Sequence, residues 1–168
     1  MAALVALEQE GWTASDVELL RDGPSYTYDT LLALHAEGLG ATQIFCITGA
    51  DAFAEIATWS RYPAVLDLAH FVVVTRPGTS LDAAVAQLPD VAARLAPPAG
   101  VGHADATRVV CLAAATPDVS STEIRRRAAA GASLADLVTP AVEQYIQRHG
   151  LYRPSPPSVD EPLHGQDR

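Results

Sequence analysis

The sequence predicts an α/β fold in which a parallel β-sheet is flanked by helices. Three apolar runs carry this prediction, at residues 44–48, 70–75 and 109–114. Each run has the length of a buried strand, and segments with helical spacing of apolar residues stand between them. Strands that alternate with helices form parallel sheets, and strands covered on both faces have continuous apolar sequences. We therefore expect the run at 44–48 to be covered on both faces.

The other elements follow from capping and turn residues. Residues 16–20 (DVELL) alternate polar and apolar side chains, which predicts one additional short strand. Gly38 and Gly150 mark helix ends, and Thr139 followed by Pro140 marks a helix start. Helices are expected over residues 2–9, 27–37, 51–57, 63–68, 81–88, 120–130 and 140–149.

Length and composition indicate one globular domain. The chain has 168 residues, of which 49% are hydrophobic, and this is enough to form a core. We expect the domain to span residues 1–152 and residues 153–168, which include four prolines, to be a disordered tail. The longest apolar runs are too short to cross a membrane, and no secretory leader is evident, so we expect a cytoplasmic protein.

The charge of the chain narrows the classes of ligand. The formal net charge is −9, and the sequence contains no lysine. Such a chain is unsuited to non-specific nucleic-acid binding, which needs clustered positive charge. A phosphate site would have to use arginines and helix N-termini. Cys46 and Cys111 lie in apolar runs, so we expect buried thiols, and no Cys or His residues have the spacing of metal ligands.

The strongest local signal for chemistry is the segment 119–125 (VSSTEIR). Glu123 lies three residues after Ser120, which predicts a capping box at the start of a helix. Three successive hydroxyls, free backbone N–H groups and Arg125 one turn later would also form an anion site. From the residues alone, both interpretations remain open.

Other candidates each have an ordinary structural alternative. Gly49 and Asp51 end a strand and open a helix. In the structural interpretation, Gly49 allows a tight turn and Asp51 is the N-cap residue. In the functional interpretation, Gly49 lets a ligand approach the backbone and the Asp51 carboxylate accepts hydrogen bonds from ribose hydroxyls. Trp59 could pack in the core or stack on a planar ring. Arg76 follows a strand and could form a surface ion pair. Thr27, next to Tyr26, could cap a helix.

Several motifs together resemble one family. Residues 23–31 (GPSYTYDTL), 47–51 (ITGAD), 70–78 (HFVVVTRPG) and 119–125 resemble the GPSYTxDTL, (I/V)xGAD, RPG and ISSTxIR motifs of bacterial nicotinate-nucleotide adenylyltransferases, and Thr58-Trp59 stands at the expected distance. The ISSTxIR motif indicates only the nucleotidylyltransferase superfamily, whereas the others narrow the resemblance to the nicotinate-nucleotide enzymes. The resemblance implies a Rossmann-like nucleotidylyltransferase fold.

It also implies a reaction and roles for individual residues. The family transfers the adenylyl group of ATP, carried with Mg²⁺, to nicotinate mononucleotide, and members can be homo-oligomers. No resident metal or membrane contact is implied. The implied ATP ligands are Gly49, Asp51, Arg76, Ser120, Ser121, Thr122 and Arg125, with Arg125 also the catalytic residue. The implied ligands of the nicotinate nucleotide are Tyr26, Thr27 and Trp59.

The sequence departs from the family at its start. Members open with a strand and a GxFDPxHxGH loop that binds the triphosphate, followed by a basic PPHK segment, and neither is present here. We therefore expect an N-terminally truncated member whose sheet lacks its first strand. One alternative is a non-catalytic nucleotide-binding remnant, because the HxGH loop is missing. Another is a related transferase that uses a different nucleotide or phosphopantetheine, against which Trp59 with Tyr26 and Thr27 argues.

Overall fold

The computed structural model describes residues 1–75, 80–115, 117 and 119–153, and the described chain forms two compact units. Unit 1 combines Met1–Ala14 with Asp118–Arg168, and unit 2 is Ser15–Pro117. The expected boundaries of one domain over 1–152 and a tail over 153–168 stay predictions, and the tail after residue 153 lies outside the described residues.

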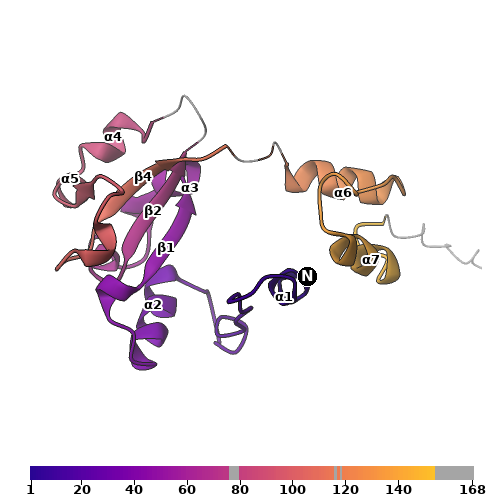
Figure 1. The fold of residues 1–168 in the computed structure, drawn as a ribbon, viewed down its shortest axis with the longest axis horizontal. Helices are drawn as coiled ribbons and strands as arrows, with labels where there is room; N and C mark the ends of the chain where they lie inside the picture. Colours follow the sequence, from indigo (N-terminus) through magenta and orange to yellow (C-terminus); the bar gives the residue numbers. More distant parts are fainter. Residues whose placement is uncertain (76–79, 116, 118, 154–168) are drawn as a thin grey trace, which may run out of the picture. The chain divides into compact units, whose positions relative to one another are not determined.

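Unit 2 is built on a parallel sheet. Strands β1 (Phe45–Gly49), β2 (His70–Thr75) and β4 (Val109–Ala113) lie side by side in Figure 1 and confirm the three predicted apolar strands. A two-residue strand, β3 (Leu95–Ala96), completes the order β1-β2-β4-β3, and all pairings are parallel. The predicted α/β fold with a parallel sheet is therefore confirmed, and β1 occupies one edge of it.

The two faces of this sheet differ in burial. Cys46, Phe71 and Val109 are in register and share the face that packs on the main core. On the opposite face, Phe45 and Ile47 of β1 are 41% and 71% exposed. The prediction that this strand is covered on both faces is wrong, because a continuous apolar run looks the same in sequence whether one or both faces are covered.

Short helices supply the rest of the core in unit 2. They are α2 (Thr27–Ala36), α3 (Ala50–Ala54), α4 (Ala83–Ala86), α5 (Pro89–Ala92) and the 3₁₀ turns Ala41–Gln43, Ile56–Thr58, Ala64–Asp67 and Val101–His103. Phe53 of α3 and Ile56 are completely buried and pack with Phe71 of β2. Helix α3 contacts both β1 and β2, so it fixes the chain that leaves the end of β1.

The predicted strand at residues 16–20 is wrong. Backbone N–H groups of Leu19 and Leu20 both donate to the carbonyl of Asp16, which closes a turn. The Thr30 hydroxyl of α2 donates to a carboxylate oxygen of Glu18 at 2.6 Å and ties this turn to the helix. Leu19 and Leu20 remain exposed, so the polar–apolar alternation buries nothing that would stabilise a strand.

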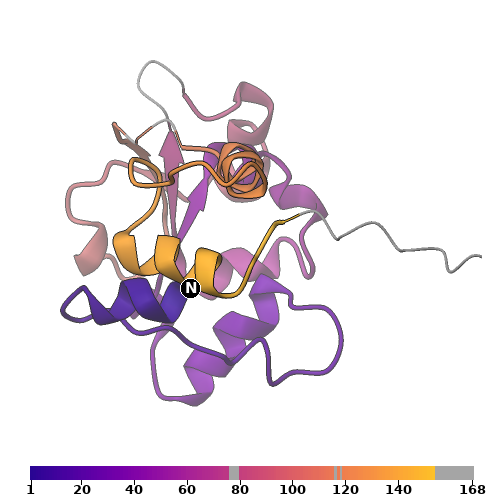
Figure 2. The same ribbon diagram turned by 90° about the vertical axis from the view of Figure 1, so that its right-hand side faces the viewer.

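Unit 1 is a small helical assembly. It contains α1 (Ala2–Leu7), α6 (Ser121–Ala129) and α7 (Pro140–Arg148), with α1 beside α7 in Figure 2. Its core consists of Ala128, Leu134, Val142 and Ile146. The three predicted helices are confirmed within one or two residues. No helix in the described ranges is long and apolar enough to cross a membrane.

The two longer helices of unit 1 differ at their N-caps. The Ser120 hydroxyl accepts the backbone N–H of Glu123 at 3.1 Å, as predicted. Thr139 occupies the N-cap position of α7, but its hydroxyl makes no capping bond and is buried without a partner among the described residues. The start of α7 therefore depends on Pro140 at its first position and on packing rather than on the hydroxyl.

Candidate functional site

A cavity of about 250 Å³ in unit 2 brings together two segments that are thirty residues apart in sequence. One segment contributes the start of α2, and the other contributes the chain around Trp59. The cavity is lined by Ser25, Tyr26, Thr27, Tyr28, Thr58, Trp59 and Ser60. An indole, two phenols and several hydroxyls in one concave site suit a planar ring that carries polar groups.

The packing around Trp59 fixes its place at the cavity. Its ring meets the ring of Phe71 edge-on, with centroids 6.2 Å apart. Phe71 is completely buried in β2, so it is a rigid support. The preceding Thr58 hydroxyl donates to the carbonyl of Glu55 at 2.8 Å and closes the 3₁₀ turn before Trp59. Trp59 is half-buried, so part of the indole remains accessible from the cavity.

Tyr26 and Thr27 also line the cavity. Tyr26 is the N-cap residue of α2, Thr27 is its first residue, and no side chain caps this helix. The structural alternative, in which Thr27 caps the helix, is therefore wrong. Both residues lie beside Trp59 in the cavity without a capping role, so the structure assembles the three predicted ligands of the nicotinate nucleotide.

The cavity also contains residues that the sequence interpretation did not assign. Ser25, Tyr28, Thr58 and Ser60 line it together with the three expected residues. Their signal in the sequence is the density of hydroxyl side chains in SYTY and TWS. That signal could have been used, but only the fold shows that the two runs face one cavity.

Gly49 and Asp51 lie where β1 passes into α3. Gly49 is the N-cap residue with φ −73° and ψ 152°, a conformation open to any amino acid, and an added Cβ would meet no described atom within 4 Å. Asp51 lies in the first turn, is exposed and makes no capping bond. Neither the turn nor the N-cap interpretation therefore accounts for these two residues, and the open space at Gly49 would admit a ligand.

In unit 1 the start of α6 presents a polar surface. Ser121, Thr122 and Arg125 are exposed, and Arg125 makes no hydrogen bond or ion pair with any residue that the structure describes. Ser120 is engaged in capping, as shown above. Residues three and four apart on a helix share a side, so Arg125 lies on the side of Ser121 and Thr122. This arrangement offers hydroxyls and one unpaired cation at a helix N-terminus.

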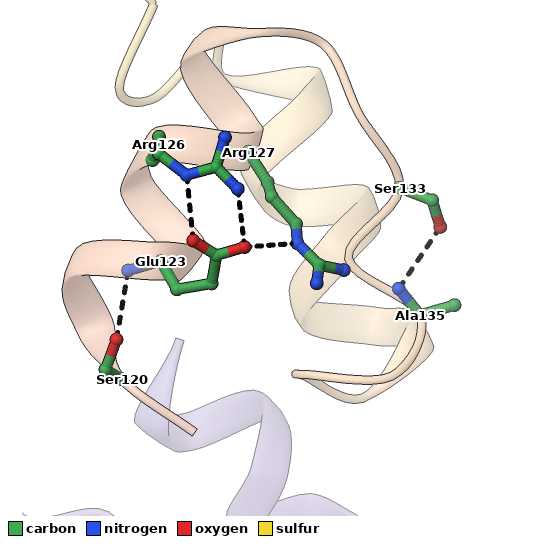
Figure 3. Close-up of polar contacts among 6 residues, drawn as sticks. All are labelled: Ser120, Glu123, Arg126, Arg127, Ser133 and Ala135. Carbon is green, nitrogen blue, oxygen red and sulfur yellow. Dashed lines mark hydrogen bonds and ion pairs between the residues drawn. The ribbon is translucent and has the colours of Figure 1, made fainter. Parts of the chain in front are cut away.

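Glu123 does not complete the expected capping box. Figure 3 shows its carboxylate turned instead toward two arginines of the same helix. Arg126 donates from Nε and Nη2 at 2.8 and 2.7 Å, and Arg127 donates from Nε at 2.7 Å. Hydrogen bonds from Arg126 and then Arg127 lower the pKa of the Glu123 carboxyl to about 2. The capping-box prediction is wrong for its second half, because an arginine pair is the stronger partner for a carboxylate.

The remaining predicted residues have simpler outcomes. Arg76 lies outside the described residues. His70 is completely buried and its Nδ1 accepts the backbone N–H of Arg108, which is the environment of a structural residue. Among the described residues, no group of three His, Cys, Asp or Glu side chains could hold a metal ion.

The two cysteines are half-buried rather than fully buried, on β1 and β4. Burial raises the pKa of both the Cys46 and the Cys111 thiol. They pack against the main core. A raised thiol pKa keeps the neutral form and makes both side chains poor nucleophiles, which agrees with a structural role.

Solved structures share the fold of this chain. The nicotinic acid mononucleotide adenylyltransferase of Plasmodium falciparum, complexed with APC, aligns with a TM-score of 0.51 at 15% identity, over 78% of this chain and 60% of that one. Its complex with NaAD gives a TM-score of 0.52 over 58% of that chain. At this identity the likeness concerns the fold, which is Rossmann-like as expected.

Sequence comparison identifies the family. No family model matches the chain. A protein named "probable nicotinate-nucleotide adenylyltransferase" from Roseiflexus sp. is 37% identical over 91% of this chain and 70% of its own length. Proteins of the same name from Acidothermus cellulolyticus and Arthrobacter sp. are 40% and 37% identical, over 67% and 72% of their lengths. The chain therefore belongs to the nicotinate-nucleotide adenylyltransferase family.

Proposed function

We propose that this protein transfers the adenylyl group of MgATP to nicotinate mononucleotide and releases pyrophosphate, in the cytoplasm. The product would be nicotinate adenine dinucleotide, a precursor of NAD. The observation that carries the proposal is the cavity of unit 2, whose lining includes Trp59, Tyr26 and Thr27. These are the three residues for which the family resemblance implies contact with the nicotinate nucleotide.

Each part of the cavity has a task in this reaction. The accessible part of the Trp59 indole would stack on the pyridine ring, and Phe71 behind it keeps the indole from turning. Tyr26 and Thr27, at the N-terminus of the ten-residue helix α2, lie where a negative group is favoured. A site of this kind fixes the nucleotide so that its phosphate is held as the nucleophile, and positioning of this kind lowers the barrier.

ATP would be held by two groups of residues. Gly49 leaves room for adenosine beside the backbone, and the exposed carboxylate of Asp51 can accept hydrogen bonds from ribose hydroxyls. On α6, Ser121, Thr122 and Arg125 would bind the phosphates. The phosphoryl chemistry needs no covalent intermediate, so the protein's contribution is orientation and stabilisation of the charge that develops in the transition state.

The decisive experiment is an adenylyl-transfer assay on the 168-residue chain with ATP, Mg²⁺ and nicotinate mononucleotide, which measures pyrophosphate release. We expect turnover that falls about a hundredfold on Arg125→Ala, because a cation that stabilises developing charge is lost. Arg148→Ala serves as the matched control, since Arg148 is an exposed arginine of unit 1 on α7.

The outcomes separate the hypotheses. Binding of ATP and nicotinate mononucleotide without turnover would favour the non-catalytic nucleotide-binding remnant. Turnover with a different acceptor nucleotide or with phosphopantetheine, and none with nicotinate mononucleotide, would favour the related transferase. Absence of both binding and turnover would refute the proposal.

A further inference from the structure

Three consecutive arginines follow the first turn of α6, and only two of them are paired. Glu123 binds Arg126 through two hydrogen bonds and Arg127 through one, as Figure 3 shows, whereas Arg125 has no partner in the described ranges. Glu123 is about one turn nearer the N-terminus than the two arginines that it holds. Its carboxylate therefore draws both guanidinium groups together at one position on the helix.

Spacing along the helix separates the paired from the unpaired arginine. Glu123, Arg126 and Arg127 are related by steps of three and four residues and so share one side of α6. Arg125 is related in the same way to Ser121 and Thr122, which lie on the adjacent side. The Glu123 carboxylate compensates one of the two positive charges, but its hydrogen bonds hold both guanidinium groups on that side of α6, while the guanidinium of Arg125 is free to attract an anion.

We propose that Glu123 determines the specificity of the phosphate site on α6, by holding Arg126 and Arg127 in ion pairs so that Arg125 alone among the three arginines engages the ligand. This inference rests on the proposed function. Three free arginines would bind any polyphosphate tightly, including the pyrophosphate that the reaction releases. One free arginine lets the site discriminate by its hydroxyls and lets the product leave.

The sign of one measurement distinguishes this role from a structural one. If Glu123 only stabilised α6, Glu123→Gln would loosen the helix and weaken anion binding. If Glu123 restrains the arginines, the same change frees two cations near the helix N-terminus. We then expect inorganic pyrophosphate to bind at least about threefold more tightly at low ionic strength, the effect of one unit charge about 6 Å away in water.

The experiment is isothermal titration of the full chain with inorganic pyrophosphate. The charge-matched control is Asp136→Asn, which removes one exposed carboxylate of unit 1 without freeing an arginine. The second arm compares the pair R126Q/R127Q in the native background and in the E123Q background. In each background, the measured quantity is the loss of pyrophosphate affinity on replacing both arginines. If Glu123 restrains Arg126 and Arg127, this loss is larger in the E123Q background, where the two arginines can reach the ligand. If the arginines keep the same positions in both backgrounds, the two losses are equal. Far-UV circular dichroism checks that α6 is retained in each variant.

Tighter binding by E123Q than by D136N, with unequal losses in the two backgrounds, would support the proposal. Unchanged or weaker binding by E123Q, an equal effect of D136N, or equal losses would overturn it. The proposed function is tested by two other measurements on the native chain, adenylyl transfer and binding of nicotinate mononucleotide. It fails if both are absent.

Discussion

Trp59 and Trp12 are the two tryptophans of the chain, and their surroundings are opposite. Trp59 lines the cavity of unit 2, whereas Trp12 is 65% exposed in unit 1. We predict that Trp59→Ala weakens binding of nicotinate mononucleotide by about tenfold, since aromatic stacking on a base contributes roughly 1–3 kcal/mol. Titration calorimetry measures the effect, and Trp12→Ala is the control. Equal affinities for the native chain and Trp59→Ala would remove Trp59 from the site.

The titration of Glu123 tests the arginine contacts directly. The pKa of its carboxyl lies at about 2 rather than at its usual 4.5. Because the folded pKa is the lower one, the stabilisation is complete above pH 4.5 and is lost as the pH falls toward 2. We predict an NMR titration midpoint near 2 for this carboxyl, and a midpoint near 4.5 in the R126Q/R127Q variant. A native midpoint near 4.5 would show that the pairs do not form in solution.

Single site residues can be predicted from the sequence, but their arrangement in space cannot. Tyr26 and Trp59 are assigned through family motifs, and spacing alone does not place them in one cavity because 32 residues stand between them in the sequence. The role of Glu123 was mistaken for a similar reason. Ser120 with Glu123 three residues later fits a capping box, and the arginines after Glu123 equally fit an ion pair with its carboxylate. Which of the two forms depends on side-chain geometry.

At the level of secondary structure, the N-caps of α6 and α7 form a natural comparison. Ser120 makes its capping bond, and the buried hydroxyl of Thr139 lacks a partner in the described part of the chain. We predict that Ser120→Ala costs about 1 kcal/mol of unfolding free energy. Thr139→Val should cost nothing or stabilise slightly, since it removes an unsatisfied buried group. Urea unfolding followed by circular dichroism measures both. Equal losses would mean that the Thr139 hydroxyl is bonded in solution.

The elements that were predictable are those whose apolar pattern is long. Strands β2 and β4 and helix α2 are predictable because five or more residues carry a consistent signal, whereas α6 is predictable from the capping residue Ser120 at its start. Residues 16–20 were misassigned because a short alternation also occurs in an exposed turn. Strand β3 was missed because Leu95–Ala96 is only two residues long and stands directly before a proline.

For the molecule as a whole, the two units differ in the size of their cores. Among the residues that the structure describes, thirteen buried hydrophobic residues form the core of unit 2, and four form the core of unit 1. Since stability follows the apolar surface buried, unit 1 should open at lower free energy. We predict that hydrogen exchange in urea deprotects the amides of α7 before those of β2. Simultaneous loss of protection in both would instead indicate a single cooperative transition.

The exposed face of β1 affects how the protein behaves in concentrated solution. Its residues include no charge and no proline, and Phe45 and Ile47 point outward at a sheet edge. Such an edge is a template for strands of other copies, opposed at neutral pH by the repulsion of a net charge of −9. That repulsion vanishes near the isoelectric point of 4.8. Light scattering should therefore rise steeply as the pH approaches this value, and Ile47→Lys should suppress the clouding.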